Sequence, residues 1–239
     1  MDGPRTSGGR TSRALIEHWP LLGLRLRTPR LELRLPDEDE LAALADVAAR
    51  GIHEPGRRPF LRPWTDVSPR DLAREVVQRH WRRRGGWTPL SWALELAVFR
   101  EGDPIAVQDL WADNYATLRE VATGSWLGLD HQGQGIGTEM RGAVLHLAFA
   151  GLGAEHARTA SFVDNPAPLA VSRKLGYRPD GITRDVLHDR AVVSERLRLT
   201  RHDWDSRERP PVTIDGLDPC LEQFGVDPAI TARPCVPEG

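Results

Sequence analysis

The segment LGLDHQGQGIGTEM, residues 127–140, has glycines at alternate positions, Gly133, Gly135 and Gly137. A helical pattern of apolar residues begins directly after them. Glycine loses more backbone entropy on folding than other residues, so this spacing indicates a backbone that must approach another group closely. The first N–H groups of a helix have no partner within it and carry partial positive charge. The segment therefore predicts a site for a phosphate or pyrophosphate.

Two better-known phosphate-binding loops do not fit this segment. A P-loop needs a lysine after its last glycine, and the only lysine of the chain is Lys174. A dinucleotide-binding loop has the spacing Gly-x-Gly-x-x-Gly near the first strand, with an acidic residue about 20 positions later. Glu155 stands near that distance, but the spacing here is Gly-x-Gly-x-Gly and the loop lies in the middle of the chain. We therefore reject both motifs.

Apolar periodicity predicts the elements that must position this loop. Strands are expected at 30–35, 90–99, 105–111, 121–129, 157–163, 182–188 and 192–200, with a weak candidate at 212–214. Helices are expected from Asp37 to Gly51, from Ser68 to about Arg84, from the glycine loop to Gly151, and at 165–174. Helices that alternate with strands in this way predict one α/β domain built on a mixed sheet.

Length and composition limit the class of protein. The 239 residues have a net charge of −2, which gives no overall attraction to nucleic acid or membranes. No apolar run approaches the roughly 20 residues that span a bilayer, and the first residues lack the apolar core of a secretion signal. Cys220 and Cys235 form no zinc-binding pattern, so no metal is expected. A cytoplasmic protein is the default prediction.

We expect a flexible arm at 1–19, one domain at 20–205 and an extension at 206–239. The stretch from Arg57 to Arg84 holds nine arginines, and charge runs of this kind usually form the solvated face of a helix. A nucleic-acid surface on this stretch is the less favoured alternative.

The stretch QGQGIG, residues 132–137, resembles the Gln/Arg-x-x-Gly-x-Gly signature of GNAT-type N-acetyltransferases, whose loop holds the pyrophosphate of acetyl-CoA. The preceding GSWLGL resembles the strand whose backbone pairs with the pantetheine arm, and SFVDNPAPLAVSRKLGY resembles the second half of these domains. RTPRLELRLPDEDE, near the start, resembles the branch that acylates ribosomal-protein N-termini. A set of actinobacterial members described as succinyl-CoA transferases shares the W-P-L start and a C-terminal extension. The resemblance covers about residues 24–205.

This resemblance implies a mixed, mostly antiparallel central sheet flanked by helices, the GNAT acyl-CoA acyltransferase fold. It implies an enzyme that uses acetyl-CoA or succinyl-CoA as co-substrate, without a metal, and acylates an amine. The acceptor is a protein N-terminus, a lysine or a small amine, and the protein is expected to form a homo-oligomer. A non-catalytic CoA-binding sensor with the same fold is the alternative.

The resemblance also assigns site residues. Leu127 and Leu129 would contact pantetheine through their backbone, and Asn165 would contact the cofactor near the thioester. The residues around the pyrophosphate would be Gln132, Gly133, Gln134, Gly135, Gly137 and Thr138. Ser172 stands where many relatives carry a tyrosine that protonates the leaving thiolate. We therefore expect Asn165 and Ser172 to be the catalytic pair.

The base that deprotonates the amine is left open by the sequence. Many relatives carry a glutamate on the strand before the loop, where this chain has Ala122 and Thr123. The candidates are Asp109, Asp113, Glu120, His131 and a water relay. Trp64, Trp111 and Trp126 are expected in core packing, with Trp64 as a further candidate for a wall of the acceptor groove.

Overall fold

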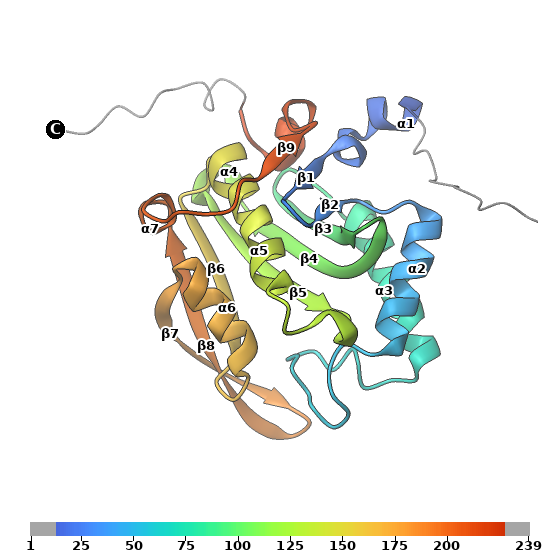
Figure 1. The fold of residues 1–239 in the computed structure, drawn as a ribbon. Coiled ribbons are helices and arrows are strands. Elements are labelled where there is room, and N and C mark those ends of the chain that lie inside the picture. Colours follow the sequence, from blue (N-terminus) through green and yellow to red (C-terminus); the bar gives the residue numbers. More distant parts are fainter. Residues whose placement is uncertain (1–12, 228–239) are drawn as a thin grey trace, which may run out of the picture.

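A nine-stranded sheet runs through residues 13–227, the part of the chain that the computed structural model describes (Figure 1). The strands are β1 (Arg25–Arg27), β2 (Glu32–Arg34), β3 (Ser91–Arg100), β4 (Asp103–Asp113), β5 (Glu120–Leu127), β6 (His156–Phe162), β7 (Arg178–Leu187), β8 (Arg190–Thr200) and β9 (Thr213–Asp215). Their order is β7-β8-β6-β5-β4-β3-β2-β1-β9. All neighbours are antiparallel except β5 and β6, which confirms the expected mixed, mostly antiparallel sheet.

The helices cover both faces of this sheet. They are α1 (Arg13–His18), α2 (Glu38–Arg50), α3 (Pro69–Gly85), α4 (Tyr115–Leu118), α5 (Ile136–His146), α6 (Pro166–Leu175) and α7 (Arg201–Asp205). Apolar residues of α2 and α3 pack against one face in a cluster that includes Val107 and Trp126. Helix α5 lies on the other face (Figure 1). Its Met140 and Val144 belong to the larger core. None of the described helices is long and apolar enough to cross a membrane.

Local sequence signals explain where α2 and α3 begin. The Asp37 side chain accepts a hydrogen bond from the Glu40 N–H at 2.9 Å, and the Glu40 carboxylate accepts one from the Asp37 N–H at 2.9 Å. This is the capping box that the sequence predicts. Ser68 caps α3 by accepting from the Asp71 N–H, with Pro69 at the first helical position. The Ser68 cap therefore ends the loop between the two helices, which begins after Gly51, the C-cap of α2.

Strands β5 and β6 pair over only a short distance before they separate. The paired residues are Glu120 with His156, Val121 with Ala157, and Ala122 with Arg158. Beyond Ala122, β5 continues to Leu127 along β4, while β6 continues along β8. The Thr159 hydroxyl still reaches the Thr123 carbonyl, at 3.2 Å. The edge of β5 after Thr123 therefore has no strand beside it on the β6 side.

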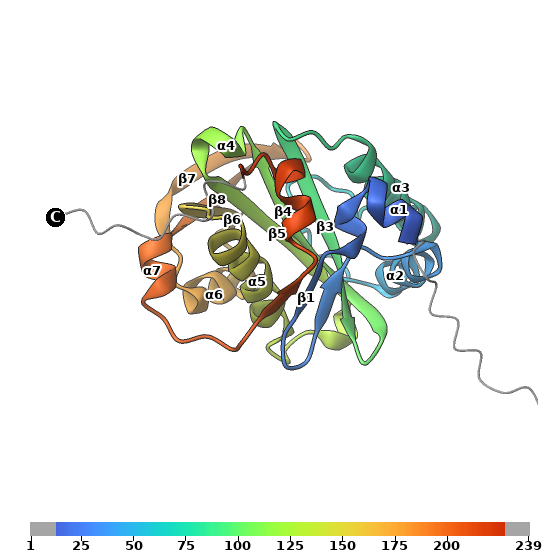
Figure 2. The ribbon, with the colours of Figure 1, turned by 90° about the horizontal axis from the view of Figure 1, so that it is seen from above.

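The ends of the chain differ from the sequence-based expectation. Within the predicted arm, residues 13–18 form α1, and the first 12 residues lie outside the described part. The weak strand candidate is confirmed as β9, which pairs with β1 (Figure 2). Cys220 and Phe224, in the predicted extension, are fully buried in the larger core. Strand β1 was not expected from the sequence, because three residues carry too little apolar periodicity to indicate a strand. It is a strand because it pairs with β2 and β9. Cys235 lies outside the described residues.

Candidate functional site

The glycine loop leads into α5 with its backbone donors free. Gly133 and Gly135 have φ of 74° and 77°, the left-handed region that favours glycine, and Gly135 is the N-cap of α5. Gly137 is already helical. Among the described residues, no group accepts a hydrogen bond from the backbone N–H of residues 133–137. This row of outward donors at a helix N-terminus is chemically suited to a phosphate or pyrophosphate.

Two arginines lie beside these donors, and no local sequence signal indicates them. The Arg30 guanidinium donates to the Gln134 carbonyl at 3.1 Å, and the Arg100 guanidinium donates to the Gln134 side-chain oxygen at 2.8 Å. Arg30 also forms an ion pair with Glu139 in the first turn of α5. The two arginines come from β3 and from the turn between β1 and β2, so only the fold brings them to the loop. They add positive charge next to the free N–H groups.

Gln132 lies at the loop, but its side chain points back into the protein. Its amide donates to the carbonyls of Ile52, at 2.9 Å, and Leu127, at 3.0 Å. It therefore ties the loop to the end of β5 and to the segment after α2. The Leu129 N–H is likewise engaged, with the Gly51 carbonyl at 3.0 Å. Neither the Gln132 amide nor the Leu129 N–H is free for a ligand in this arrangement.

The open edge of β5 provides backbone groups for an extended ligand. Because the Thr123 carbonyl faces β6, alternation along the strand directs the backbone groups of Ser125 and Leu127 to the same side. The Leu127 carbonyl already accepts from Gln132. Ser125 therefore presents its backbone to the gap between β5 and β6. The free N–H groups of residues 133–137 follow β5 along the chain, at the start of α5. The strand edge and the loop together are chemically suited to an extended ligand that ends in a phosphate or pyrophosphate.

The structure places Asn165 and Ser172 on α6, next to the end of β6. Asn165 is the N-cap of α6 and is half-buried, and its side-chain amide makes no hydrogen bond within the described chain. Ser172 is 1% exposed; its hydroxyl donates to the Pro168 carbonyl at 2.9 Å and accepts from Arg141 at 2.8 Å. The two residues thus share a helix as predicted, but the Ser172 proton is engaged inside that helix.

Arg141 lies beside Ser172, and no sequence motif singled it out. It lies on α5 and is 5% exposed, and its Nε has no hydrogen-bond partner. No carboxylate of the described residues forms an ion pair with it, and burial lowers the pKa of its guanidinium. Nearby, the Tyr177 hydroxyl lies 3.4 Å from the Thr123 hydroxyl. A buried, unpaired cation therefore lies beside Ser172, close to where β5 leaves β6; its only signal in the sequence is an arginine among apolar helix residues.

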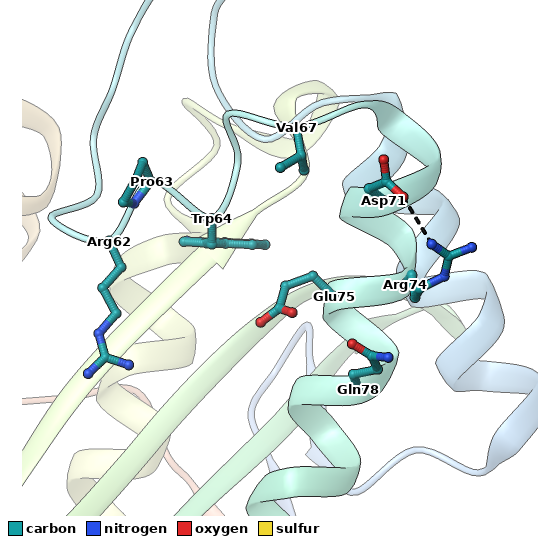
Figure 3. A pocket seen from close by; sticks show the side chains of 8 residues that line it. All are labelled: Arg62, Pro63, Trp64, Val67, Asp71, Arg74, Glu75 and Gln78. Atoms are coloured by element: carbon teal, nitrogen blue, oxygen red, sulfur yellow. Dashed lines mark hydrogen bonds and ion pairs between the residues drawn. The ribbon is translucent and has the colours of Figure 1, made fainter. Parts of the chain in front are cut away.

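A pocket of about 510 Å³ lies on the α3 side of the sheet (Figure 3). Its walls come from the loop before α3 and from α3 itself: Arg62, Pro63, Trp64, Val67, Asp71, Arg74, Glu75 and Gln78. The Trp64 ring lies 6.5 Å from the Trp126 ring of β5, between ring centroids. Trp64 therefore packs against the core, as expected, and also lines this pocket.

A smaller cavity of about 210 Å³ lies along α5, on the other side of the glycine loop. Gly135, Thr138 and Arg30 line the end nearest the loop, and His146 and Arg209 lie further along. Arg209, Pro210 and Val212, from the segment that follows α7, also line this cavity. Figure 2 shows the course of that segment from α7 to the strand beside β1. The smaller cavity thus adjoins the N-terminus of α5.

The four candidate bases lie in different surroundings. Asp113 accepts a hydrogen bond from Ser91 at 2.6 Å at the exposed end of β4, and Glu120 pairs with Arg158 and Arg198 where β5 begins. His131 lies in the turn that follows β5. Asp109, in the middle of β4, is the buried one of the four. Trp111 and Gly124 adjoin it on the α3 face of the sheet.

Residues 30–178 match the family described as the acetyltransferase (GNAT) domain. Among solved structures, the chain is similar to RimL, a ribosomal L7/L12 α-N-protein acetyltransferase in complex with coenzyme A. The two chains are 19% identical, with a TM-score of 0.59, over 72% of this chain and 95% of that one. Mycobacterium smegmatis RimJ, in complex with CoA-disulfide, gives 16% identity and a TM-score of 0.59 over 78% of this chain and 95% of that one.

The ribosomal-protein-S5-alanine acetyltransferase of Vibrio fischeri is also similar, with 16% identity and a TM-score of 0.56 over 75% of this chain and 98% of that one. At these identities the structural matches show the fold, and the match over residues 30–178 covers more than half of the chain. The glycine loop, the separated strands and α6 all lie within or next to the matched residues. This protein is a member of the GNAT acetyltransferase family.

Proposed function

We propose that the protein is an acyl-CoA-dependent N-acyltransferase that moves an acetyl or succinyl group from CoA to an amine. The observation that carries this proposal is the row of free N–H groups at residues 133–137, which leads directly to the open edge of β5. The first feature suits a pyrophosphate, and the second suits an extended amide-containing arm. A phosphate site without the open edge would be equally suited to many nucleotides.

In this proposal the pyrophosphate of CoA binds residues 133–137, with Arg30 and Arg100 close by. The pantetheine arm lies along Ser125 and Leu127, and the thioester lies near Gly124, where β5 and β6 begin to separate. The amine nitrogen forms a bond to the acyl carbon, the C–S bond breaks, and CoA leaves as a thiolate. An amine that arrives as an ammonium ion must first lose a proton.

Ser172 and Asn165 lie on the side of β6 and α6. We propose that the Asn165 amide, which has no partner in the described chain, contacts the donor near the thioester. The Ser172 hydroxyl receives a hydrogen bond from the Arg141 cation, which makes the hydroxyl a better donor. Ser172 would turn its proton from the Pro168 carbonyl to the thiolate as charge develops on sulfur.

Acyl-CoA is expected to stabilise the folded protein. A ligand that binds only the folded state adds about 2.7 kcal/mol at 100 times its Kd. For a chain of this size, about 2–4 °C per kcal/mol corresponds to a rise in Tm of roughly 5–10 °C. A thermal-shift titration with CoA, acetyl-CoA and succinyl-CoA measures this rise, and no response to any of the three would remove the basis of the proposal.

Release of free CoA tests whether binding leads to transfer. With a panel of N-terminal peptides, lysine peptides and small amines, an enzyme should release CoA only in the presence of an acceptor. The rival is a CoA-binding sensor, which the internal hydrogen bond of Ser172 and the absence of a glutamate at residues 122 and 123 favour. A protein that binds acyl-CoA but releases no CoA with any amine would be that sensor. We also propose a homo-oligomer, which light scattering of the purified protein measures.

Succinyl-CoA is the donor that we propose, because the Arg62 guanidinium has no ion pair among the described residues and lines the pocket on the α3 side (Figure 3). The alternative arginine, Arg173, already pairs with Glu195 at 3.2 Å. A charge-assisted hydrogen bond is worth about 1.5–3 kcal/mol, and exposure places Arg62 at the lower end. Arg62→Met should therefore lower kcat/KM for succinyl-CoA roughly tenfold and leave acetyl-CoA unchanged, with Arg173→Met as the control. A wild-type preference for acetyl-CoA would contradict this choice.

A further inference from the structure

A cluster of charged side chains is buried between α3 and the centre of the sheet. Arg79 and His80 come from α3, Glu95 from β3 and Asp109 from β4. Arg79 donates to Glu95 at 3.0 Å and to Asp109 at 2.5 Å. The His80 Nδ1 lies 3.2 Å from the second oxygen of Glu95. Two carboxylates therefore share one arginine, while Asp109 Oδ1 is buried without a partner.

This arrangement is costly if it serves the fold alone. A buried polar atom without a hydrogen bond costs free energy, and such atoms in native proteins are uncommon. Glu95 has His80 and Arg79 as partners, so its charge is well satisfied. Asp109 has a single donor and lies next to a like charge. The unpaired oxygen of Asp109 is thus the one carboxylate atom of the cluster that is left open to a further hydrogen bond or proton.

The position of Asp109 in the sheet places its carboxylate next to β5. Asp109 lies directly opposite Gly124, and both residues face α3. A Cβ on Gly124 would lie 3.8 Å from Asp109 Oδ2 and 3.2 Å from the Trp111 ring. Ala122 is the last residue of β5 that pairs with β6, and Gly124 is the next residue on the α3 face. The carboxylate therefore lies under the part of β5 at which the two strands separate.

The same face of the sheet connects this point to the pocket on the α3 side. Trp126 follows Gly124 on the α3 face of β5, and its ring packs against Trp64, which lines the pocket. Trp126 and Gly124 therefore lie along β5 between Trp64 of the pocket and the gap beside β6, and an acceptor from the pocket would follow this face. Gly124 adds no side chain of its own beside the carboxylate, and the Trp111 ring is the nearest group to the position that its Cβ would take.

We propose that Asp109 is the general base of the transfer reaction, and that it takes a proton from the acceptor ammonium at Gly124, directly or through one water. The inference rests on the proposed function. Two protons leave the acceptor nitrogen. The first goes to Asp109 and frees the lone pair that attacks the acyl carbon; the second goes to the CoA thiolate after the C–S bond breaks. Asp109 then returns its proton to water, so the products are the amide, CoA thiol and one proton.

The charges around Asp109 suit this role near neutral pH. Burial and the negative charge of Glu95 raise the pKa of Asp109 to about 7, against the opposing charges of Arg79 and Arg83. Burial also acts to raise the pKa of Glu95, but the hydrogen bond from His80 and the charge of Arg79 lower it overall. Glu95 therefore stays ionised while Asp109 exchanges its proton. Gly124 and Trp111, which cover Asp109 from the sheet, carry no charge.

The pH dependence of kcat/KM for the acceptor tests the proposal. In the wild type, activity should fall as the pH drops below about 7, because Asp109 becomes protonated. Asp109→Asn should lower kcat/KM by roughly 10² to 10⁴ and remove this acidic limb, since general-base catalysis is typically worth that much. Asp113→Asn, on the same strand at its exposed end, is the matched control and should leave the limb and the rate unchanged.

Glu95→Gln separates catalysis from structure. It removes the like charge beside Asp109, so the acidic limb should move to lower pH, whereas a purely structural role predicts no such shift. An Asp109→Asn variant that keeps both its rate and its acidic limb would overturn the proposal. Loss of the limb in Glu75→Gln would also overturn it, because Glu75 is a carboxylate that lines the pocket on the α3 side. A wild type that binds acyl-CoA but transfers to no amine would overturn the proposed function itself.

Discussion

Gly135→Val is expected to abolish acyl-CoA binding in a protein that remains folded. Gly135 is the N-cap of α5 with φ of 77°, a region that a β-branched residue avoids at a cost of about 1–3 kcal/mol. Its surroundings are open, because the atom nearest to the position that a Cβ would take is an Arg30 nitrogen at 3.6 Å. The valine side chain would project among the free N–H groups of residues 133–137, where a phosphate must approach.

Calorimetry measures this effect as a loss of CoA affinity of at least about 100-fold, corresponding to roughly 2.7 kcal/mol. Gly153→Val is the matched control, because Gly153 also has positive φ, 73°, and lies beyond the opposite end of α5. The tip of the flexible Arg119 side chain is the nearest group to its Cβ position. Both variants carry similar backbone strain, so a loss confined to Gly135→Val assigns the effect to the ligand. Equal affinity in the two variants would exclude the loop as the pyrophosphate site.

Ser172→Ala is expected to lower kcat by about 10²-fold with little change in KM for acyl-CoA. A hydrogen bond from Ser172 to the sulfur strengthens only as the thiolate forms, so its loss belongs in kcat. A serine proton is much less acidic than that of a tyrosine, which places the effect at the low end of general-acid catalysis, roughly 10² to 10⁴. The measurement is steady-state kinetics with a nucleophilic amine and saturating donor.

The same substitution should also destabilise the protein, because it removes the acceptor of the buried Arg141 guanidinium. Leaving a buried charged donor unsatisfied costs about 1–3 kcal/mol or more. The double variant Ser172→Ala/Arg141→Met removes both polar partners, which is nearly neutral for stability in well-packed sites. We therefore expect the double variant to recover much of its Tm but none of its kcat.

Recovery of kcat together with Tm would assign Ser172 and Arg141 to the fold alone. Wild-type turnover in Ser172→Ala would show that the thiolate leaves unaided. These two outcomes are distinguishable because stability and turnover are measured on the same samples.

Local signals in the sequence determined a large part of this protein. The capping box at Asp37 and the proline at the start of α3 locate two helices, because caps act within a few residues. The alternate glycines locate the N-terminus of α5, because positive φ is a local demand that glycine meets. The class of sheet and the family follow from these elements and from the stretches on either side of the loop. Gly133 and Gly135 have the backbone that their spacing indicates.

Contacts between distant segments were decided by the tertiary structure alone. Arg30 and Arg100 reach the glycine loop, and β9 pairs with β1, although each pair is far apart in the chain. Asp109 and Glu95 each interrupt an apolar strand, which marks them as unusual, but the register of β4 with β3 and β5 is what places Asp109 between Glu95 and Gly124. Register and helix packing are set by the whole core, so no single stretch of sequence encodes them. A carboxylate becomes a candidate base through the neighbours that bury it, and those neighbours come from three different elements.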